Sequence, residues 1–225
     1  MIPLRDNTKA HSVPFVTIAI ITINILIYLL QSTFTLVELE QWIMTYALIP
    51  QKFTEQLHSS SMSGFLHLPL LTSIFLHGGW FHVLFNMLYL WIFGDNIEDQ
   101  LGHARFLLFY LLAGIAANLA HVVFFPGSPI PLVGASGAIA GVLGAYIITF
   151  PRACITSLIF VVFFVTVRKI PAVYFLIFWF VLQLANALMS LGLMGNSVAW
   201  WAHTGGFVAG ILLMLLFRKP LIKDL

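Results

Sequence analysis

Six long apolar runs restrict this chain to few folds. They lie at residues 13–30, 79–93, 106–125, 133–150, 172–189 and 200–217. Runs of about 15–20 apolar residues are typical of membrane-crossing helices, whereas strands of a membrane β-barrel alternate in polarity over about ten residues. Only 8% of the residues are charged, against about a quarter in a soluble domain. The sequence therefore predicts an all-α membrane protein with six transmembrane helices.

Two stretches between these runs need a separate interpretation. Residues 31–74 form a long first loop whose apolar and aromatic side chains predict an element at the membrane interface, rather than a free linker; these are Trp42, Tyr46, Phe65 and Leu68. Residues 153–170 are apolar enough to cross a membrane, but they are rich in Val, Ile, Phe and Thr, which favour strands. We predict a membrane-surface insertion there. A seventh helix in this stretch would invalidate the topology that follows.

The basic residues predict how the chain is oriented. With a cytoplasmic N-terminus, nine of the ten Lys and Arg residues fall on the cytoplasmic side and only Lys52 falls on the outer side. Such a bias matches the positive-inside rule, so both termini are expected to be cytoplasmic. The nine are Arg5, Lys9, Arg105, Arg152, Arg168, Lys169, Arg218, Lys219 and Lys223.

The first apolar run is not expected to be a cleaved signal. It is 18 residues long, no A-x-A cleavage site follows it, and no Arg- and Ser-rich transit segment precedes it. We therefore expect a multi-pass protein of a prokaryotic cell (inner) membrane. Residues 1–225 are expected to form a single transmembrane domain, without a separate soluble domain.

Four polar residues near the starts of the apolar runs are the notable functional candidates, because an ionisable or buried polar side chain is costly in a membrane span. They are His82, Asn86, Ser136 and His203. Each lies in the first turn or two of the second, fourth or sixth run. These three helices would cross the membrane in the same direction. All four side chains are therefore expected at a similar depth below the outer face.

Small residues predict which helices touch. Gly137, Gly141 and Gly144 recur on one side of the fourth helix, and Gly206 and Gly210 follow His203 on one side of the sixth. Stripes of small residues let helix backbones approach closely in lipid. We therefore expect the fourth and sixth helices to pack together and to bring Ser136 towards His203. A serine within hydrogen-bond reach of an imidazole is an activated nucleophile, and the imidazole is its general base.

The same chemistry needs donors for the charge on a tetrahedral intermediate. His82 and Asn86 are four residues apart, so they share one helix face and suit an oxyanion hole. Backbone N–H groups at the start of the fourth helix, around Ser136, would add to it. Taken one at a time, Ser136 could instead bond a carbonyl of its own helix, His203 could be a packing or proton-relay group, and His82 and Asn86 could be interhelical hydrogen-bonders. Only their common depth and facing favour a site.

Other polar residues are expected to act as interhelical hydrogen-bonders. These are Asn118 and His121 on the third helix and Gln183 and Asn186 on the fifth. His77 and His82 are five residues apart, which is wrong for a shared helix face, so we predict no metal site. The single Cys154 excludes an internal disulfide and a multi-cysteine metal site.

Several hydrolase classes are excluded by what the sequence lacks. No H-E-x-x-H occurs, which argues against a zinc metalloprotease. No aspartate falls in the middle of a predicted helix, which argues against a paired-aspartate membrane protease. Ala138 stands where the nucleophile elbow G-x-S-x-G requires glycine. No outer-side carboxylate is evident as a partner for His203, so a serine hydrolase here would use a Ser–His pair.

Three motifs together resemble those of the rhomboid family of intramembrane serine proteases. They are HGGWFHVLFN, with His82 and Asn86; GASG, with Ser136; and AHTGG, with His203. The segment GDNIEDQLG is similar to the cytoplasmic turn of that family. The resemblance covers nearly the whole chain. One departure is Ala140, one turn after Ser136, where some relatives carry a tyrosine that stacks on the histidine.

The resemblance implies a six-helix bundle with a water-filled cavity open to the outer side. Ser136 would attack a peptide bond in or near a transmembrane segment, with His203 as base and with His82 and Asn86 as oxyanion donors. The fifth helix and the loop at about 190–199 would form a gate. No cofactor or metal is implied.

The expected partners are membrane-protein substrates with a helix-unstable transmembrane segment, and the lipid bilayer, but not nucleic acid. Two alternatives remain open at the sequence level. One is an inactive rhomboid-like protein that binds membrane helices in quality control. The other is a small channel or transporter, which would tend to show internal repeats or ionisable residues at mid-depth.

Overall fold

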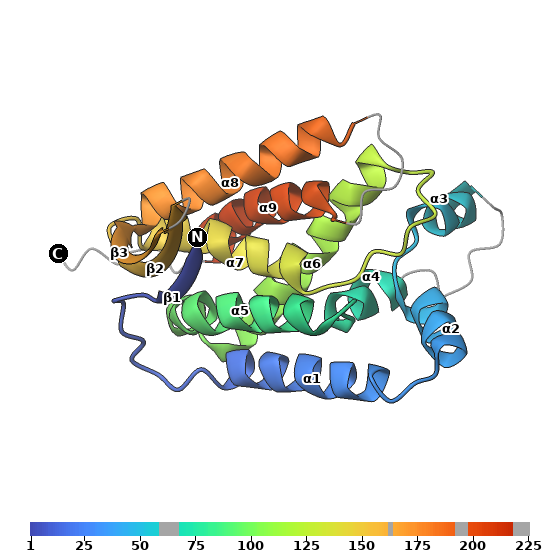
Figure 1. Ribbon diagram of the computed structural model, residues 1–225, viewed down its shortest axis with the longest axis horizontal. Coiled ribbons are helices and arrows are strands. Elements are labelled where there is room, and N and C mark those ends of the chain that lie inside the picture. Colours follow the sequence, from blue (N-terminus) through green and yellow to red (C-terminus); the bar gives the residue numbers. More distant parts are fainter. Residues whose placement is uncertain (59–67, 162–163, 192–197, 218–225) are drawn as a thin grey trace.

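In the computed structural model, six helices of 14 to 22 residues form the bundle among the described residues (Figure 1). The structure describes residues 1–58, 68–161, 164–191 and 198–217. The helices are α1 (Phe15–Gln31), α5 (Trp80–Leu101), α6 (His103–Phe124), α7 (Ser136–Thr149), α8 (Ala172–Met189) and α9 (Trp200–Phe217). Each overlaps one predicted run, and α8 and α9 have the predicted bounds. The second helix was predicted too short, because α5 continues past Phe93 through the polar segment that ends at Leu101.

Length and apolar composition make several of these helices candidate membrane spans. The helices α6, α8 and α9 are each long and apolar enough to cross a bilayer, while α1 and α7 are apolar but shorter. The pair formed by Leu68–Phe75 and α5, bent by 93°, is long and apolar enough when taken together. Among the described residues this gives three or four candidate spans, so the structure supports a helical multi-pass membrane protein.

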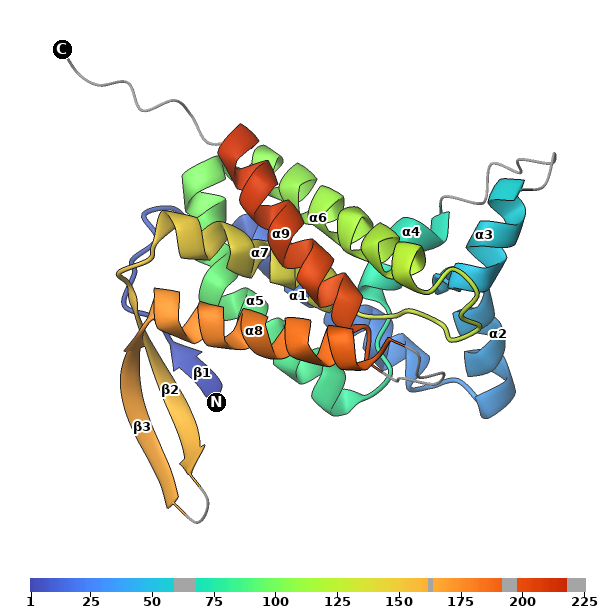
Figure 2. The same ribbon diagram turned by 90° about the horizontal axis from the view of Figure 1, so that it is seen from above.

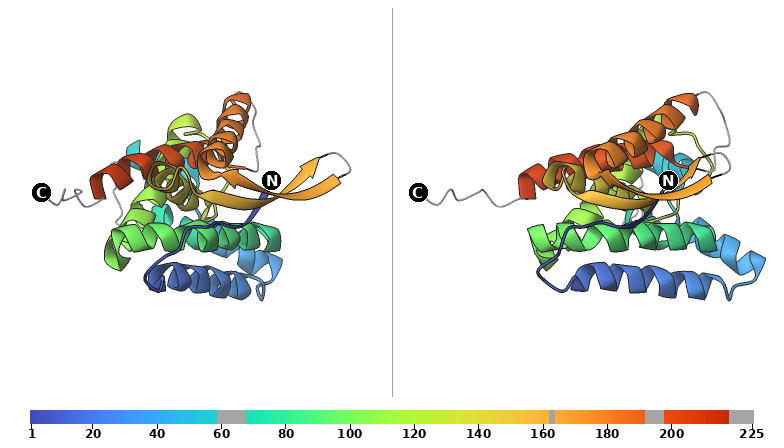
Figure 3. Two further views of the ribbon diagram at one scale, coloured as in Figure 1. Left: turned by 90° about the vertical axis from the view of Figure 1, so that its left-hand side faces the viewer. Right: turned by 60° about the vertical axis from the view of Figure 1, so that its left-hand side comes forward.

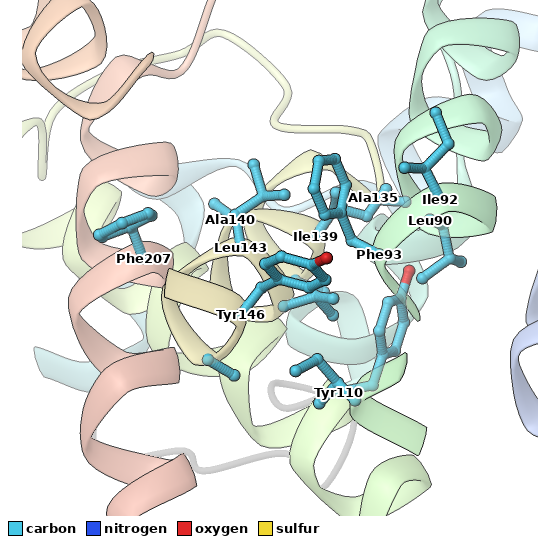
Figure 4. Close-up of a cluster of buried hydrophobic side chains, with 14 of the residues drawn as sticks. Leu90, Ile92, Phe93, Tyr110, Ala135, Ile139, Ala140, Leu143, Tyr146 and Phe207 are labelled. Carbon is cyan, nitrogen blue, oxygen red and sulfur yellow. The ribbon is translucent and has the colours of Figure 1, made fainter. Parts of the chain in front are cut away.

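The short helix α7 lies inside the bundle rather than against lipid. All of its residues from Gly137 to Tyr146 are buried. Figure 4 shows side chains of α5, α6 and α9, including Phe93, Tyr110 and Phe207, gathered around those of α7. A helix enclosed by protein does not need the length of a lipid-exposed span. The 14 residues of α7 are therefore sufficient to place its first residue at one end of the core.

The helices alternate in direction along the chain. In Figures 1 and 2, α5, α7 and α9 run one way through the bundle, and α1, α6 and α8 run the other way. The first residues of α5, α7 and α9 therefore lie towards the same end. A common depth of the polar residues at these helix starts requires this arrangement, and their depth in the membrane stays a prediction.

The first loop is folded rather than extended. Its described part contains α2 (Leu36–Tyr46), α3 (Pro50–His58), α4 (Leu68–Thr72) and a 3-10 turn, η2 (Ser73–Phe75). Trp42 packs against Phe34 and Tyr46, and a Thr35–Glu38 capping box starts α2. The loop contacts the segment before α7, because Leu48 and Leu132 exchange backbone hydrogen bonds of 3.3 and 2.7 Å. Phe65, of the predicted interfacial set, lies outside the described residues.

A three-stranded antiparallel sheet corrects the all-α prediction. It has the order β1-β2-β3 and is made by β1 (Ile2–Arg5), β2 (Cys154–Val161) and β3 (Phe164–Pro171). The stretch at 153–170 is thus a hairpin and not a seventh helix, as its β-branched residues indicated. Figures 2 and 3 show the hairpin projecting sideways from the end of the bundle where α7 ends and α8 begins. Its placement on a membrane surface stays a prediction.

Candidate active site

Ser136 is the first residue of α7. The preceding segment carries Pro129 and Pro131, which disfavour helix, and then Gly134, whose φ of 128° L side chains rarely adopt. The Gly134 N–H donates to the Ser73 carbonyl oxygen over 2.9 Å, which ties this turn to η2. The backbone bonds of the new helix begin when the Ile139 N–H donates to the Ala135 carbonyl. The earlier N–H groups of the first turn have no partner within the helix itself.

His203 lies in the first turn of α9, and its imidazole contacts Ser136 directly. The distance from His203 Nε2 to Ser136 Oγ is 2.8 Å, although the two residues are 67 positions apart. Both residues are half-buried. The structure therefore brings together the two side chains that the sequence singled out as nucleophile and base.

Glycines on α7 and α9 account for this closeness. A Cβ atom built on Gly206 would collide with the carbonyl oxygen of Gly137, and one built on Gly210 with the carbonyl oxygen of Gly141. In the other direction, a Cβ on Gly144 would collide with the carbonyl oxygen of Phe207. The two backbones lie against each other with no room for side chains, as small-residue stripes allow.

His203 has a second polar partner, on α8. Its Nδ1 lies 2.8 Å from Oε1 of Gln183, a side chain that is buried. Two indole rings lie near the imidazole: the ring centroids of Trp179 and Trp200 are 6.2 and 6.0 Å from that of His203. The sequence predicted Gln183 only as an interhelical hydrogen-bonder and did not assign it to the site. The one indication in the sequence was its spacing of four residues from Trp179, which places both side chains on one face of α8.

His82 and Asn86 lie in the first two turns of α5. The His82 ring is close to Gly134, because a Cβ atom there would be 2.7 Å from His82 Nε2 and 3.6 Å from Ser136 Oγ. The imidazole and the serine hydroxyl thus flank the same backbone position. His82 Nδ1 accepts a long hydrogen bond of 3.4 Å from the Gly78 N–H. Asn86 is buried, and its amide Nδ2 has no hydrogen-bond partner among the described residues.

Comparison with known proteins identifies the family. The sequence pattern of the Rhomboid domain matches residues 66–220, which is most of the chain. The chain belongs to the rhomboid family. It is 30% identical over 179 residues, or 73% of its length, to the presenilin-associated rhomboid-like protein, mitochondrial, of Mus musculus. It is 34% identical over 148 residues, or 66% of its length, to RHOMBOID-like protein 1 of Arabidopsis thaliana.

A bacterial relative shows higher identity over a shorter stretch. The chain is 54% identical to the rhomboid protease GluP of Bacillus subtilis over 76 residues, or 34% of its own length. The matches cover 14%, 34% and 44% of the GluP, Arabidopsis and mouse proteins, so the chain spans less than half the length of each.

The other polar residues of this rhomboid have different partners. Asn118 Nδ2 donates to the Leu70 carbonyl and to Ser73 Oγ, so it joins α6 to α4 and η2. Asn186 bonds the Leu182 carbonyl of its own helix, and the prediction of an interhelical role for it is wrong for the described residues. The His121 ring packs beside Phe125.

The His77 and His82 rings meet edge to face, with centroids 5.1 Å apart. The Gln31 side chain makes two hydrogen bonds to the His77 backbone. Its Oε1 accepts from the His77 N–H over 3.2 Å, and its Nε2 donates to the His77 carbonyl over 3.3 Å. In the part of the chain that the structure describes, no three or more His, Cys, Asp or Glu side chains are grouped so as to hold a metal ion.

Replacing Gly134 with alanine is expected to lower the rate of the chemistry at Ser136 by about 10- to 100-fold while the protein stays folded. The backbone at φ 128° would be strained by about 1–3 kcal/mol, and the new methyl would displace the His82 ring from its place beside Ser136. The measurement is the labelling rate of Ser136 by a fluorophosphonate, together with thermal unfolding in detergent.

Gly78→Ala is the matched control for Gly134→Ala. A Cβ atom on Gly78 would meet the same ring at an ordinary contact distance of 3.9 Å, and its N–H is retained. Equal labelling rates for the two variants would contradict a role for the position of His82.

Proposed function

We propose that this rhomboid is an intramembrane serine endopeptidase that cleaves transmembrane segments of membrane proteins with a Ser136–His203 pair. The observation that carries the proposal is the 2.8 Å distance from His203 Nε2 to Ser136 Oγ. An imidazole nitrogen at that distance can accept the hydroxyl proton as the oxygen attacks. Family membership supports the proposal, since one relative is named as a rhomboid protease.

The reaction follows from these two atoms. Ser136 Oγ forms a bond to the carbonyl carbon of the scissile peptide and transfers its proton to His203 Nε2. The resulting tetrahedral intermediate collapses as the C–N bond breaks, and His203 donates the proton to the leaving amine. An ester to Ser136 remains. Water then attacks this ester with His203 again as base, and the carboxylic acid product leaves with the serine restored.

His82 and Asn86 are proposed to stabilise the negative charge on the tetrahedral intermediate. Asn86 Nδ2 is a buried donor without a partner among the described residues, so it can donate to an oxyanion without first breaking another bond. The imidazole of His82 lies beside the turn that leads into Ser136. The N–H groups of the first turn of α7, at Ser136 and the residues after it, are at the positive end of the helix dipole and are proposed as further donors.

Hydrolysis within a membrane protein also requires water. Ser136, His203 and His82 lie at the starts of α7, α9 and α5, which lie towards one end of the bundle (Figure 1). We propose that this end opens to the outer aqueous side, with six spans and with both termini in the cytoplasm of a prokaryotic cell. A shallow site can be wetted from that side without exposing backbone to lipid.

The substrates are proposed to be membrane proteins whose transmembrane segment unwinds easily, because a peptide must be extended to reach a nucleophile. The helix α8 and the loop at about 190–199 are proposed to form a gate for the substrate, and most of that loop lies outside the described residues. A poly-leucine segment is expected to be cut much more slowly than one with small and helix-breaking residues.

The experiment that tests the function is cleavage of a single-span reporter in proteoliposomes, with Ser136→Ala as the inactive variant. Cleavage by the wild type and none by Ser136→Ala is the expected outcome. A fluorophosphonate is expected to label the wild type on Ser136 and to leave Ser136→Ala unlabelled. Wild-type protein that neither cleaves nor labels would instead indicate an inactive member of the family that only binds membrane helices.

A further inference from the structure

We propose that Gln183 is a positioning residue for the reaction: its Oε1 holds the proton of His203 on Nδ1 and so leaves Nε2 free to act as the base. The inference rests on the proposed function, because it assigns a role within that same site. It also identifies the group that orients the histidine, for which the sequence offered neither a carboxylate nor a tyrosine at position 140.

The tautomer of the imidazole decides whether His203 can act. Neutral imidazole carries one proton, on either Nδ1 or Nε2. The oxygen Oε1 of Gln183 is only an acceptor and lies 2.8 Å from Nδ1, so Nδ1 is the nitrogen that donates. The lone pair of Nε2 then points at Ser136 Oγ, also 2.8 Å away. The opposite tautomer would present an N–H to the serine and could not take its proton.

In the hydrogen bond between Gln183 and His203 the Gln183 side chain is buried, so water does not readily replace it. Gln183 is 9% exposed. A buried amide costs free energy unless it is hydrogen-bonded, and a hydrogen bond in an apolar interior is stronger than one in water. The ring centroids of Trp179, one turn earlier on α8, and of Trp200 on α9 lie 6.2 and 6.0 Å from that of the same imidazole. The ring is therefore held by contacts from two helices.

Because Gln183 lies on α8, the orientation of His203 depends on the contact between α8 and α9. The helix α8 is exposed along much of its length, at Tyr174, Val181 and Met189 among others. Its polar link to α9 among the described residues is the Gln183–His203 bond. His203 is thus oriented as a base only while α8 lies against α9.

The test compares three variants on α8 in proteoliposomes with the single-span reporter. Gln183→Leu removes the acceptor at similar volume, Gln183→Glu keeps an acceptor oxygen in the same place, and Asn186→Leu is the control. Asn186 is half-buried, and among the described residues its side chain bonds only its own helix. We expect Gln183→Leu to lower kcat by about 10- to 100-fold with KM changed less than about twofold, because an orienting group acts on the chemical step. Gln183→Glu is expected to stay within about fivefold of the wild type, as is Asn186→Leu.

The split between kcat and KM separates this role from a purely structural one. A loss of packing would lower thermal stability and would change kcat and KM together, whereas the loss of an orienting group lowers kcat alone. If Gln183→Leu does not fold, Gln183→Asn, which keeps the amide but is one methylene too short, is expected to show the same selective loss of kcat. Full activity in either variant would overturn the proposal, and so would equal losses in Gln183→Leu and Gln183→Glu. An inactive wild type would instead refute the protease function itself.

Discussion

Replacing His203 with alanine is expected to lower kcat for reporter cleavage by about 10⁴-fold or more, with little change in KM. The reason is that the Ser136 hydroxyl is a weak nucleophile without a base, and His203 Nε2 is the nitrogen that lies 2.8 Å from it. The loss falls on the chemical step, because the same group is needed to accept the proton and to return it to the amine. The measurement is initial cleavage rate against reporter concentration in proteoliposomes.

The same cleavage assay is applied to Ser136→Ala and to the double variant that combines Ser136→Ala with His203→Ala. The two residues act as one unit, so the double variant is expected to be no slower than either single variant. His58→Ala, at the end of α3, is the control and is expected to cleave at the wild-type rate, because it lies on a different element from the pair. Cleavage by His203→Ala within about tenfold of the wild type would show that another group is the base.

Substitution of Gly210 by valine is expected to destabilise the protein by about 3 kcal/mol or more and to abolish cleavage. Even a single Cβ atom at this position would collide with the backbone of Gly141, on the facing helix. Because the obstacle is backbone rather than a flexible side chain, α7 and α9 must move apart. A separation at this point also pulls Ser136 and His203 out of hydrogen-bond range.

The measurement for Gly210→Val is unfolding in mixed detergent micelles, followed by helix content, with cleavage assayed on the folded fraction. Gly127→Val is the control, because a Cβ atom at Gly127 would meet no atom within 4 Å. Wild-type stability of Gly210→Val would mean that the glycine contact between α7 and α9 is not essential to the bundle.

The positions of the membrane helices could be predicted from sequence, since apolar length is a local property of the chain. The predicted bounds of α8 and α9 agree with the structure. The end of α5 was missed because its last turns are polar: Glu98 accepts from Thr17 Oγ1 over 2.7 Å and from the N–H groups of Val16 and Thr17. The buried carboxylate at the end of α5 is stabilised by hydrogen bonds from another helix, α1. Hydropathy considers only the residues of one stretch, so it does not detect this stabilisation.

The sheet was only partly predictable. The abundance of β-branched residues at 153–170 predicted strand, but its partner β1 comes from the other end of the chain. Ile2 pairs with Leu158, and Asn7 Oδ1 accepts from the Cys154 N–H over 2.6 Å. Pairing between segments so far apart depends on where the bundle places α7 and the N-terminus, so no local pattern contains it.

By itself, the sequence determined the membrane class of this protein, its helix-forming segments and the identities of four polar candidates. Hydropathy, helical spacing and residue type are sufficient for these, because each is a property of a short stretch. Only the tertiary structure decided that Ser136 and His203 are hydrogen-bonded and that Gln183 lies on the other side of the imidazole. These contacts join α7, α8 and α9, and they depend on backbone approach at glycines and on the rotation of each helix about its axis. Both are set by packing of the whole bundle.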